Sequence, residues 1–246
     1  MGLYTSISQL LPDPLRLRYR GHLCRDGKKV TMSDFAIHAT SYAFNVPTIL
    51  LLGTSMSAGK TTTGRRVCKE LDRAGLFVVG AKLSGAGRYR DILSFLKTGA
   101  AAIFDFVDVG LPSTVVPEPV YRNAIRPLLN KINDLAPDFL VAEAGASPLE
   151  PYNGAAVMDE LGDNIVCTIL CASDPYAVVG VEKAFGLVPD LVTGPATQTS
   201  AAVELVRKLT GLRGINIIDP TTKDEFREFL EEKLEVACSD QSKKIA

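Results

Sequence analysis

The chain has 246 residues, of which 46% are hydrophobic, so it is long enough to bury the core of one large α/β domain. Its 27 Lys and Arg residues nearly balance its 28 Asp and Glu residues, and no segment concentrates positive charge. This balance excludes the broad basic surface of a nucleic-acid-binding protein, so a small molecule is the expected partner.

The N-terminus lacks the layout of a signal peptide, and no apolar run reaches the roughly 18 residues that span a bilayer. We therefore expect a cytoplasmic protein without a membrane partner. The five cysteines are odd in number, and Cys167 and Cys171 stand inside an apolar run. Because His22 and His38 have no clustered partners either, the sequence predicts neither a disulfide framework nor a zinc site.

The first 45 residues differ in pattern from the rest of the chain. Apolar residues alternate with basic ones from Leu15 to Leu23, which predicts a strand with a basic face. Asp26 and Gly27 then supply the residue types of a tight hairpin turn. We expect a small β appendage over residues 1–45, which also fits the remnant of a longer parent protein.

From Thr48 onward, short apolar runs alternate with helical patterns, which predicts an α/β fold with a mostly parallel sheet flanked by helices. The expected strands are Thr48 to Leu52, Phe77 to Leu83, Phe139 to Glu143, Val166 to Ala172, Leu191 to Thr193 and Ile215 to Ile218. The expected helices are Thr61 to Ala74, Tyr89 to Lys97, Val120 to Asp134, Ala177 to Phe185, Gln198 to Thr210 and a last amphipathic helix with Phe226, Phe229, Leu230 and Leu234 on one face. This domain is expected over residues 46–238, followed by a frayed tail over 239–246.

The first of these strands runs directly into a glycine-bounded loop, and a helical pattern follows at once. The loop residues are Gly53, Thr54, Ser55, Met56, Ser57, Ala58, Gly59, Lys60, Thr61 and Thr62. Strand, loop and helix in this order are the context that identifies a P-loop. The sequence therefore predicts that these ten residues bind the phosphates of a nucleoside triphosphate.

The residue types of the loop explain this chemistry. Backbone N–H groups and the start of a helix form a concave site for phosphate oxygens, and Gly59 lets the backbone approach them closely. We expect Lys60 to bridge the β and γ phosphates, Thr61 to ligate Mg²⁺ and Thr62 to reach the α phosphate. A guanine-reading Asn-Lys-x-Asp motif is absent from Val192 to Thr197, so ATP is the expected nucleotide.

Five residues separate Gly53 from Gly59, and this spacing resembles the loop of dethiobiotin synthetases and of cobyrinic and cobyric acid amide synthases. The segment Val79 to Gly85 is similar to the synthetase motif in which a strand-end lysine binds the substrate carbamate and the γ phosphate. The resemblance thus implies a catalytic Lys82 as well as Lys60.

The segment Phe139 to Gly145 is similar to the synthetase strand that ends in the acidic, Mg²⁺-linked Walker B equivalent. A carboxylate at the end of a buried parallel strand also faces the nucleotide crevice on physical grounds, so Glu143 is a candidate catalytic and metal-binding residue. The nearest candidates for a further metal-binding aspartate of that family are Asp108 and Asp105. Ser55 and Ala86 replace an aspartate and a serine of the synthetase pattern, so we expect a different metabolite.

Residues 143–154 also resemble a family of P-loop proteins that carry an N-terminal Rossmann-type domain and are linked to N-acyl-D-amino acid metabolism. The first 45 residues of this chain are too short for that domain. Between Gly85 and Arg90, the sequence fits either a second anion-binding turn with Arg88 or Arg90, or a loop with solvated arginines.

The leading functional hypothesis is transfer of the γ-phosphoryl group of Mg-ATP to a carboxylate or carbamate of a small metabolite, by a synthetase or ligase. An amine metabolite is an alternative partner. The second hypothesis is an ATP-dependent switch that controls dimerisation or a partner, as in partitioning ATPases, and the third is a regulatory nucleotide-binding module. A homodimer is implied by the synthetase resemblance alone.

Overall fold

The computed structural model describes residues 7, 9–10, 12–39, 42–145 and 147–245. The chain divides into two compact units, 1–31 and 32–246, whereas the sequence placed the domain boundary after residue 45. Residues 32–45 group with the larger unit because the Ile37 N–H donates to the Asp108 carbonyl at 2.8 Å and Phe44 is buried in the core. The domain limits otherwise stay a prediction.

The smaller unit contains an antiparallel hairpin of β1 (Cys24–Arg25) and β2 (Lys28–Lys29). Asp26 and Gly27 have φ angles of 51° and 74°, so the predicted hairpin turn is confirmed. The strand predicted from Leu15 to Leu23 is wrong, because those residues lie outside any strand and their apolar side chains are exposed. An alternating apolar and polar sequence forms a strand only where a neighbouring strand pairs with it and a core buries its apolar side chains.

Within the described residues, six strands form one sheet in the order β5-β4-β6-β3-β7-β8, and every pairing is parallel. The strands are β3 (Thr48–Gly53), β4 (Val78–Lys82), β5 (Ala102–Asp105), β6 (Phe139–Glu143), β7 (Ile165–Cys171) and β8 (Leu191–Thr193). The carboxyl ends of parallel strands share one edge of the sheet. This arrangement brings Gly53, Lys82, Asp105 and Glu143 to that edge.

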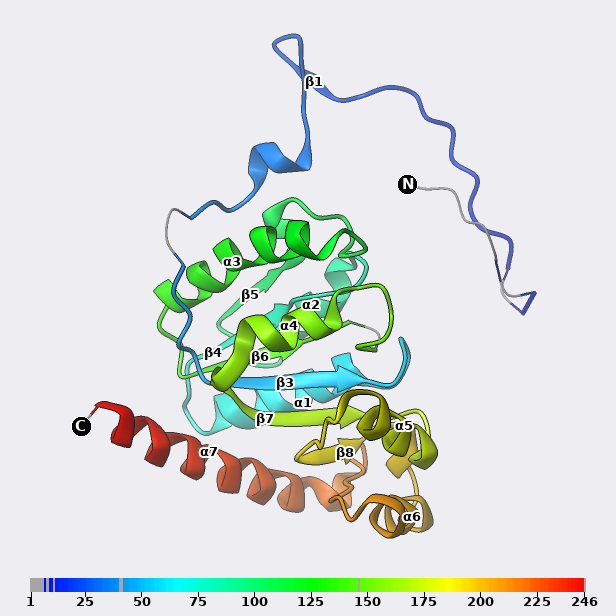
Figure 1. The fold of residues 1–246 in the computed structure, drawn as a ribbon, viewed down its shortest axis with the longest axis vertical. Helices are drawn as coiled ribbons and strands as arrows, with labels where there is room; N and C mark the ends of the chain where they lie inside the picture. Colours follow the sequence, from blue (N-terminus) through cyan, green and yellow to red (C-terminus); the bar gives the residue numbers. More distant parts are fainter. Residues whose placement is uncertain (1–6, 8, 11, 40–41, 146, 246) are drawn as a thin grey trace. The chain divides into compact units, whose positions relative to one another are not determined.

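Helices cover both faces of the sheet, as Figure 1 shows, so the predicted α/β fold class is confirmed. One face is covered by α1 (Lys60–Arg73), α2 (Tyr89–Leu96) and α7 (Lys223–Ile245). The other is covered by α3 (Glu118–Asp134), α4 (Gly154–Leu161), α5 (Pro175–Phe185) and α6 (Ser200–Thr210). Successive side chains of β3 point to opposite faces of the sheet and so join the hydrophobic cores on both faces. Ile49 and Leu51 pack on the first face, and Leu50 and Leu52 pack on the second.

The elements depart from the sequence prediction in four places. Strand β5 and helix α4 were not predicted, and α7 continues to Ile245 where a tail was expected from residue 239. The strand expected from Ile215 to Ile218 does not form. The Ile215 N–H donates to the Val192 carbonyl at 3.0 Å, but the chain then turns into the 3-10 helix η5 (Pro220–Thr222). No helix in the described part of the chain is long and apolar enough to cross a membrane.

Candidate functional site

The glycine-bounded loop connects β3 to α1 across the carboxyl edge of the sheet. Gly59 has a φ of 104°, a left-handed conformation that favours glycine, and it stands immediately before the first residue of α1. The Thr54 N–H donates to the Cys171 carbonyl at 3.0 Å, which fixes the start of the loop on β7. Lys60 is buried, and its Nζ donates to the Ser55 carbonyl at 2.8 Å inside the loop. The predicted loop thus has the strand, turn and helix that a P-loop requires.

A second glycine holds the loop from the side of β8. A Cβ atom on Gly194 would lie 2.3 Å from the Ala58 carbonyl oxygen, so a side chain at this position would push the loop away. Beside this contact lies a cavity of about 210 Å³, lined in part by Gly59, Thr62 and Asn216. The loop therefore borders a pocket whose lining includes the start of α1.

Thr61 and Glu143, both predicted metal ligands, lie in direct contact. The Thr61 hydroxyl donates to Glu143 Oε2 at 3.0 Å. Glu143 is 4% exposed, and burial raises its pKa while the nearby Lys82 and Lys60 ammonium groups oppose that rise. For the Lys60 ammonium, burial lowers the pKa and Glu143 counters the effect. The charges of Glu143 and Lys60 therefore stabilise each other.

Lys82 stands on β4 directly beside Glu143 on β6 and Asp105 on β5, since the strand pairing places each in register with Lys82. Side chains in register on parallel strands project from the same face, so Lys82 and Glu143 lie side by side. Lys60, at the start of α1, is near enough for the charges of both residues to act on it. Lys82 Nζ is bonded to Asp91 Oδ2 at 3.0 Å, and only 8% of the lysine side chain is exposed. Asp91, in the first turn of α2, was missed by the sequence analysis.

The loops after β4 and β6 are held close together. A Cβ atom on Gly145 would lie 2.2 Å from the Ser84 carbonyl oxygen, and the Gly145 N–H donates to Ser84 Oγ at 2.9 Å. The Leu83 N–H donates to the Glu143 carbonyl at 2.9 Å. These contacts fix the strand ends that carry Lys82 and Glu143.

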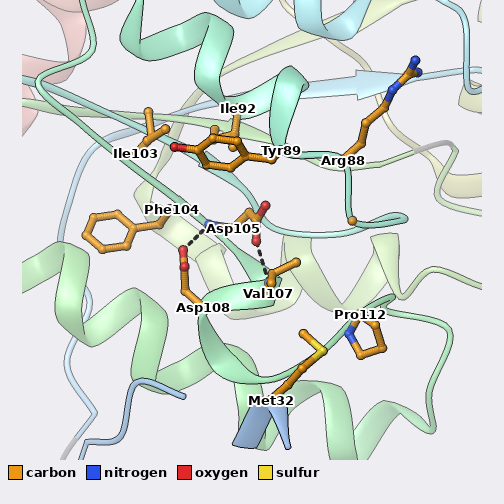
Figure 2. Close-up of a pocket in the computed structure, with 11 residues that line it drawn as sticks. Met32, Arg88, Tyr89, Ile92, Ile103, Phe104, Asp105, Val107, Asp108 and Pro112 are labelled. Carbon is orange, nitrogen blue, oxygen red and sulfur yellow. Dashed lines mark hydrogen bonds between the residues drawn. The ribbon is translucent and has the colours of Figure 1, made fainter. Parts of the chain in front are cut away.

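The two predicted aspartates cap a short helix at the sheet edge, as Figure 2 shows. Asp105 Oδ1 accepts from the Val107 N–H at 2.6 Å, and Asp108 Oδ2 accepts from the Asp105 N–H at 2.8 Å; both bonds belong to the 3-10 helix η2 (Phe106–Val109). Among the residues that the structure describes, no three His, Cys, Asp or Glu side chains are grouped to hold a metal. A metal role for Asp108 stays a prediction, whereas its capping role is visible.

The backbone of the expected anion-binding turn is largely used within the protein. The Gly85 N–H donates to Thr114 Oγ1 at 2.8 Å, and the Gly87 N–H donates to the Pro112 carbonyl at 3.2 Å. Arg88 Nε lies 3.9 Å from Asp91 Oδ1. These bonds favour the alternative of a structural turn with a solvated arginine.

The cysteines near the loop serve packing. Burial raises the pKa of Cys171 to about 12, and its sulfur lies 3.2 Å from the Thr63 hydroxyl. Such a thiol stays protonated at neutral pH and is a poor nucleophile. Cys68 on α1 has a pKa raised to about 12 for the same reason.

No protein-family model matches this chain, and no curated protein matches its sequence. Solved structures do resemble it. Hydrogenase maturation factor HypB from Archaeoglobus fulgidus is 16% identical, with a TM-score of 0.51 over 77% of this chain and 91% of HypB. A DUF1611 family protein from Anabaena variabilis gives 12% identity and a TM-score of 0.49 over 80% of this chain and 62% of the other.

Chloroplast FtsY from Physcomitrella patens is 14% identical, with a TM-score of 0.46 over 75% of this chain and 61% of FtsY. The chain therefore spans about three fifths of the length of FtsY and of the DUF1611 protein. At such identities the likeness concerns the fold alone. The fold that this chain shares with HypB is an α/β fold with a parallel sheet flanked by helices.

Proposed function

We propose that the protein binds Mg-ATP and transfers the γ-phosphoryl group to a carboxylate or carbamate oxygen of a small metabolite. The observation that carries the proposal is the second buried lysine, Lys82, in register with Glu143 beside the loop lysine, Lys60. Phosphoryl transfer is accelerated mainly by positioning and by neutralising charge, and cations on two sides of a phosphoryl group serve both needs.

The residues fit Mg²⁺ as a partner of the nucleotide. Mg²⁺ prefers oxygen ligands, keeps several waters and is commonly held by one or two protein groups together with substrate phosphates. The Thr61 hydroxyl and the Glu143 carboxylate, 3.0 Å apart, are a donor set of this kind. When bound, the ion would neutralise charge on the phosphates, and Glu143 would orient Thr61 toward it.

Each lysine has a distinct task in this proposal. Lys60 holds its ammonium inside the loop, where phosphate oxygens would replace the Ser55 carbonyl as partner. Lys82, held by Asp91 at 3.0 Å, would meet the acceptor oxygen and the γ phosphate. In the transfer, the bond from the γ phosphorus to the bridging β–γ oxygen breaks, a bond to the acceptor oxygen forms, and ADP leaves with the bridging oxygen.

The 210 Å³ cavity beside Gly59 and Thr62 is the proposed place of the base and ribose. The side-chain amides of Asn216 and Gln198 line it and offer both donors and acceptors to a base. Since the sequence from Val192 to Thr197 carries no guanine-reading motif, adenine is the proposed base.

A nucleotide-controlled switch is the second candidate function. Met56 in the loop is 70% exposed, and Tyr176 in the first turn of α5 is 67% exposed. Large apolar side chains at the carboxyl edge of the sheet favour a partner that covers them. In that case nucleotide binding would change the oligomeric state or the partner affinity, with slow hydrolysis.

The test measures phosphate release from Mg-ATP with a panel of carboxylates and of amines in bicarbonate, which form carbamates. We expect at least one metabolite to raise turnover, Lys60→Ala to abolish nucleotide binding, and Lys82→Ala to keep binding while losing the stimulation. Lys69→Ala is the matched control, because Lys69 is an exposed lysine on the same helix as Lys60.

Three results separate the candidates. Stimulated turnover that depends on Lys82 supports phosphoryl transfer to a metabolite. Stimulated turnover that Lys82→Ala leaves unchanged overturns the role of Lys82. Turnover that no metabolite raises, together with an ATP-dependent change of oligomeric state in ultracentrifugation, favours the switch.

A further inference from the structure

A cavity of about 530 Å³ opens where β5 ends and η2 begins, and Figure 2 shows the residues around it. Its size falls within the range of small-molecule sites. Most of the wall is apolar and comes from separate elements. Ile92 belongs to α2, Ile103 to β5, Val107 to η2 and Met32 to the 3-10 helix η1 (Met32–Phe35). An apolar wall built from several elements suits the body of an organic ligand.

A buried carboxylate lies at the centre of this cavity. Figure 2 shows Asp105 between the ring of Tyr89 and the backbone of Val107. Asp105 is 5% exposed, and its Oδ1 accepts from the Val107 N–H at 2.6 Å. The Asp105 carboxylate also accepts from the Asp108 backbone N–H, which completes the cap of η2. A carboxylate accepts about four hydrogen bonds, so two backbone donors leave part of the capacity of Asp105 for a ligand.

The charges around the cavity favour a cation. Asp105 and Asp108 are both acidic, and Arg88 is the basic residue among the described residues of the lining. The guanidinium of Arg88 points away from Asp105 in Figure 2. Lys82 is in register with Asp105, but its ammonium is bonded to Asp91 at 3.0 Å. Burial raises the pKa of Asp105, although the Val107 and Asp108 N–H groups and the charge of Lys82 oppose the rise, and a cation within the cavity would oppose it further.

An organic cation suits the cavity better than a metal ion. The described residues contain no group of three His, Cys, Asp or Glu side chains that could hold a metal. The Tyr89 ring, which lines the same cavity, adds an aromatic face of the kind that attracts ammonium groups. The cavity also lies near the site already described, since Asp105 stands one strand from Lys82 and two strands from Glu143. Neighbouring strands are about 4.8 Å apart, so the span is that of a small metabolite.

We propose that this cavity binds the amine end of the phosphoryl acceptor, a small metabolite with a protonated nitrogen on an apolar body, and that Asp105 is its anionic partner. This assignment rests on the proposed function, because it places the amine where the other end of the metabolite reaches Lys82.

Binding of phenethylamine and of its neutral analogue 2-phenylethanol, followed by NMR titration of the full chain, tests the proposal. We expect the amine to bind at least tenfold more tightly than the alcohol. Asp105→Asn removes this tenfold preference, while its amide oxygen still accepts from the Val107 N–H and keeps the cap. Val107→Phe narrows the cavity at a 37% exposed position and weakens both probes.

Asp219→Asn is the matched control. Asp219 caps the 3-10 helix η5 in the same way, with Oδ1 accepting from the Thr221 N–H at 2.9 Å, but it does not line this cavity. We expect this variant to bind both probes as the wild type does. Equal binding of amine and alcohol, or an amine preference that survives Asp105→Asn, would overturn the proposal.

Binding of ATP to the same proteins separates this inference from the proposed function. ATP binding without an amine preference contradicts the amine site and leaves the proposed function standing. An Asp105-dependent amine preference in a protein that binds no ATP supports the amine site and contradicts the proposed function.

Discussion

The Thr61 hydroxyl donates to Glu143 Oε2 at 3.0 Å, although the two residues are 82 positions apart in the sequence. The contact exists because β3 and β6 are neighbours, with Leu51 in register with Glu143, and α1 begins just beyond β3. A hydroxyl and a carboxylate therefore meet at the first turn of the helix that follows the loop. This pair is the proposed Mg²⁺ site, and two of the predictions below depend on it.

Glu143→Gln should lower Mg²⁺-dependent turnover about 100-fold, in the range seen when one group that stabilises transition-state charge is lost. The amide still accepts from Thr61 but carries no charge for the ion. ATP binding without Mg²⁺ should stay within about threefold of wild type. Steady-state kinetics over a Mg²⁺ series and a binding titration check both values. Glu204→Gln, on α6, is the control, and a Glu143→Gln protein with wild-type turnover would exclude Glu143 from the metal site.

Lys82 and Asp91 should be coupled in stability. Their side chains are 8% and 18% exposed, and loss of one partner removes the ion pair that compensates the other charge most directly. Removing one partner of a fully buried ion pair destabilises a protein by about 3–5 kcal/mol. Replacing both partners with apolar residues often destabilises it far less. We expect the double variant to lose less stability than the sum of the losses in Lys82→Met and in Asp91→Leu. Urea unfolding of all four proteins gives the coupling free energy, and simple additivity would contradict the pairing.

The sequence predicts the loop and most of the sheet because local signals suffice there. Strand β3 is a buried apolar run, and Gly59 and Lys60 follow it at P-loop spacing. Strand β5 is not predicted because its four residues follow Gly99, Ala100 and Ala101, which have low strand propensity, and because β4 is its one partner among the described strands. Helix α4 was missed because Gly154 follows a segment of turn-forming residues.

Parts of the site depend on contacts that no local pattern reveals. Asp91 lies nine residues after Lys82, but their ion pair needs α2 to fold back over β4. Asp105 was identified as a metal candidate from its place in the sequence, whereas its capping bond to Val107 depends on where β5 ends. Tertiary position, which the sequence does not encode locally, decides both roles.

The raised pKa of Glu143 predicts a pH dependence of stability in the nucleotide-free protein. Burial raises this pKa above its usual value of about 4.3, so the folded state binds more protons than the unfolded state at pH values between the two. The contribution of Glu143 to stability is then full below about pH 4.3 and is lost as pH rises through the folded pKa.

Glu143→Gln removes this titration, so stability measured against pH should fall less steeply above about pH 4.3 than in wild type. Thermal unfolding from pH 4 to 8 checks the slope, and Glu204→Gln should retain the wild-type slope. Identical slopes in wild type and Glu143→Gln would show that burial does not raise this pKa.

Gly194→Ala should displace the phosphate loop as well as strain the backbone. Gly194 has a φ of 90°, and its added Cβ would lie 2.3 Å from the Ala58 carbonyl oxygen. Gly211→Ala is the matched control, because Gly211 has a φ of 73° but an added Cβ meets no atom within 4 Å. Backbone strain costs about 1–3 kcal/mol in such conformations, and we expect Gly211→Ala to lose that much. Gly194→Ala should lose at least as much, because its ψ of −157° lies in a region that is essentially restricted to glycine.

The displacement of the loop sets Gly194→Ala apart from its control. Only this variant should also weaken ATP binding, by about tenfold or more, because the Ala58 carbonyl and the neighbouring Gly59 must shift together. Equilibrium unfolding and an ATP titration of the two variants measure the two effects separately. Equal ATP affinity in Gly194→Ala and Gly211→Ala would mean that the turn after β8 does not hold the loop in its binding conformation.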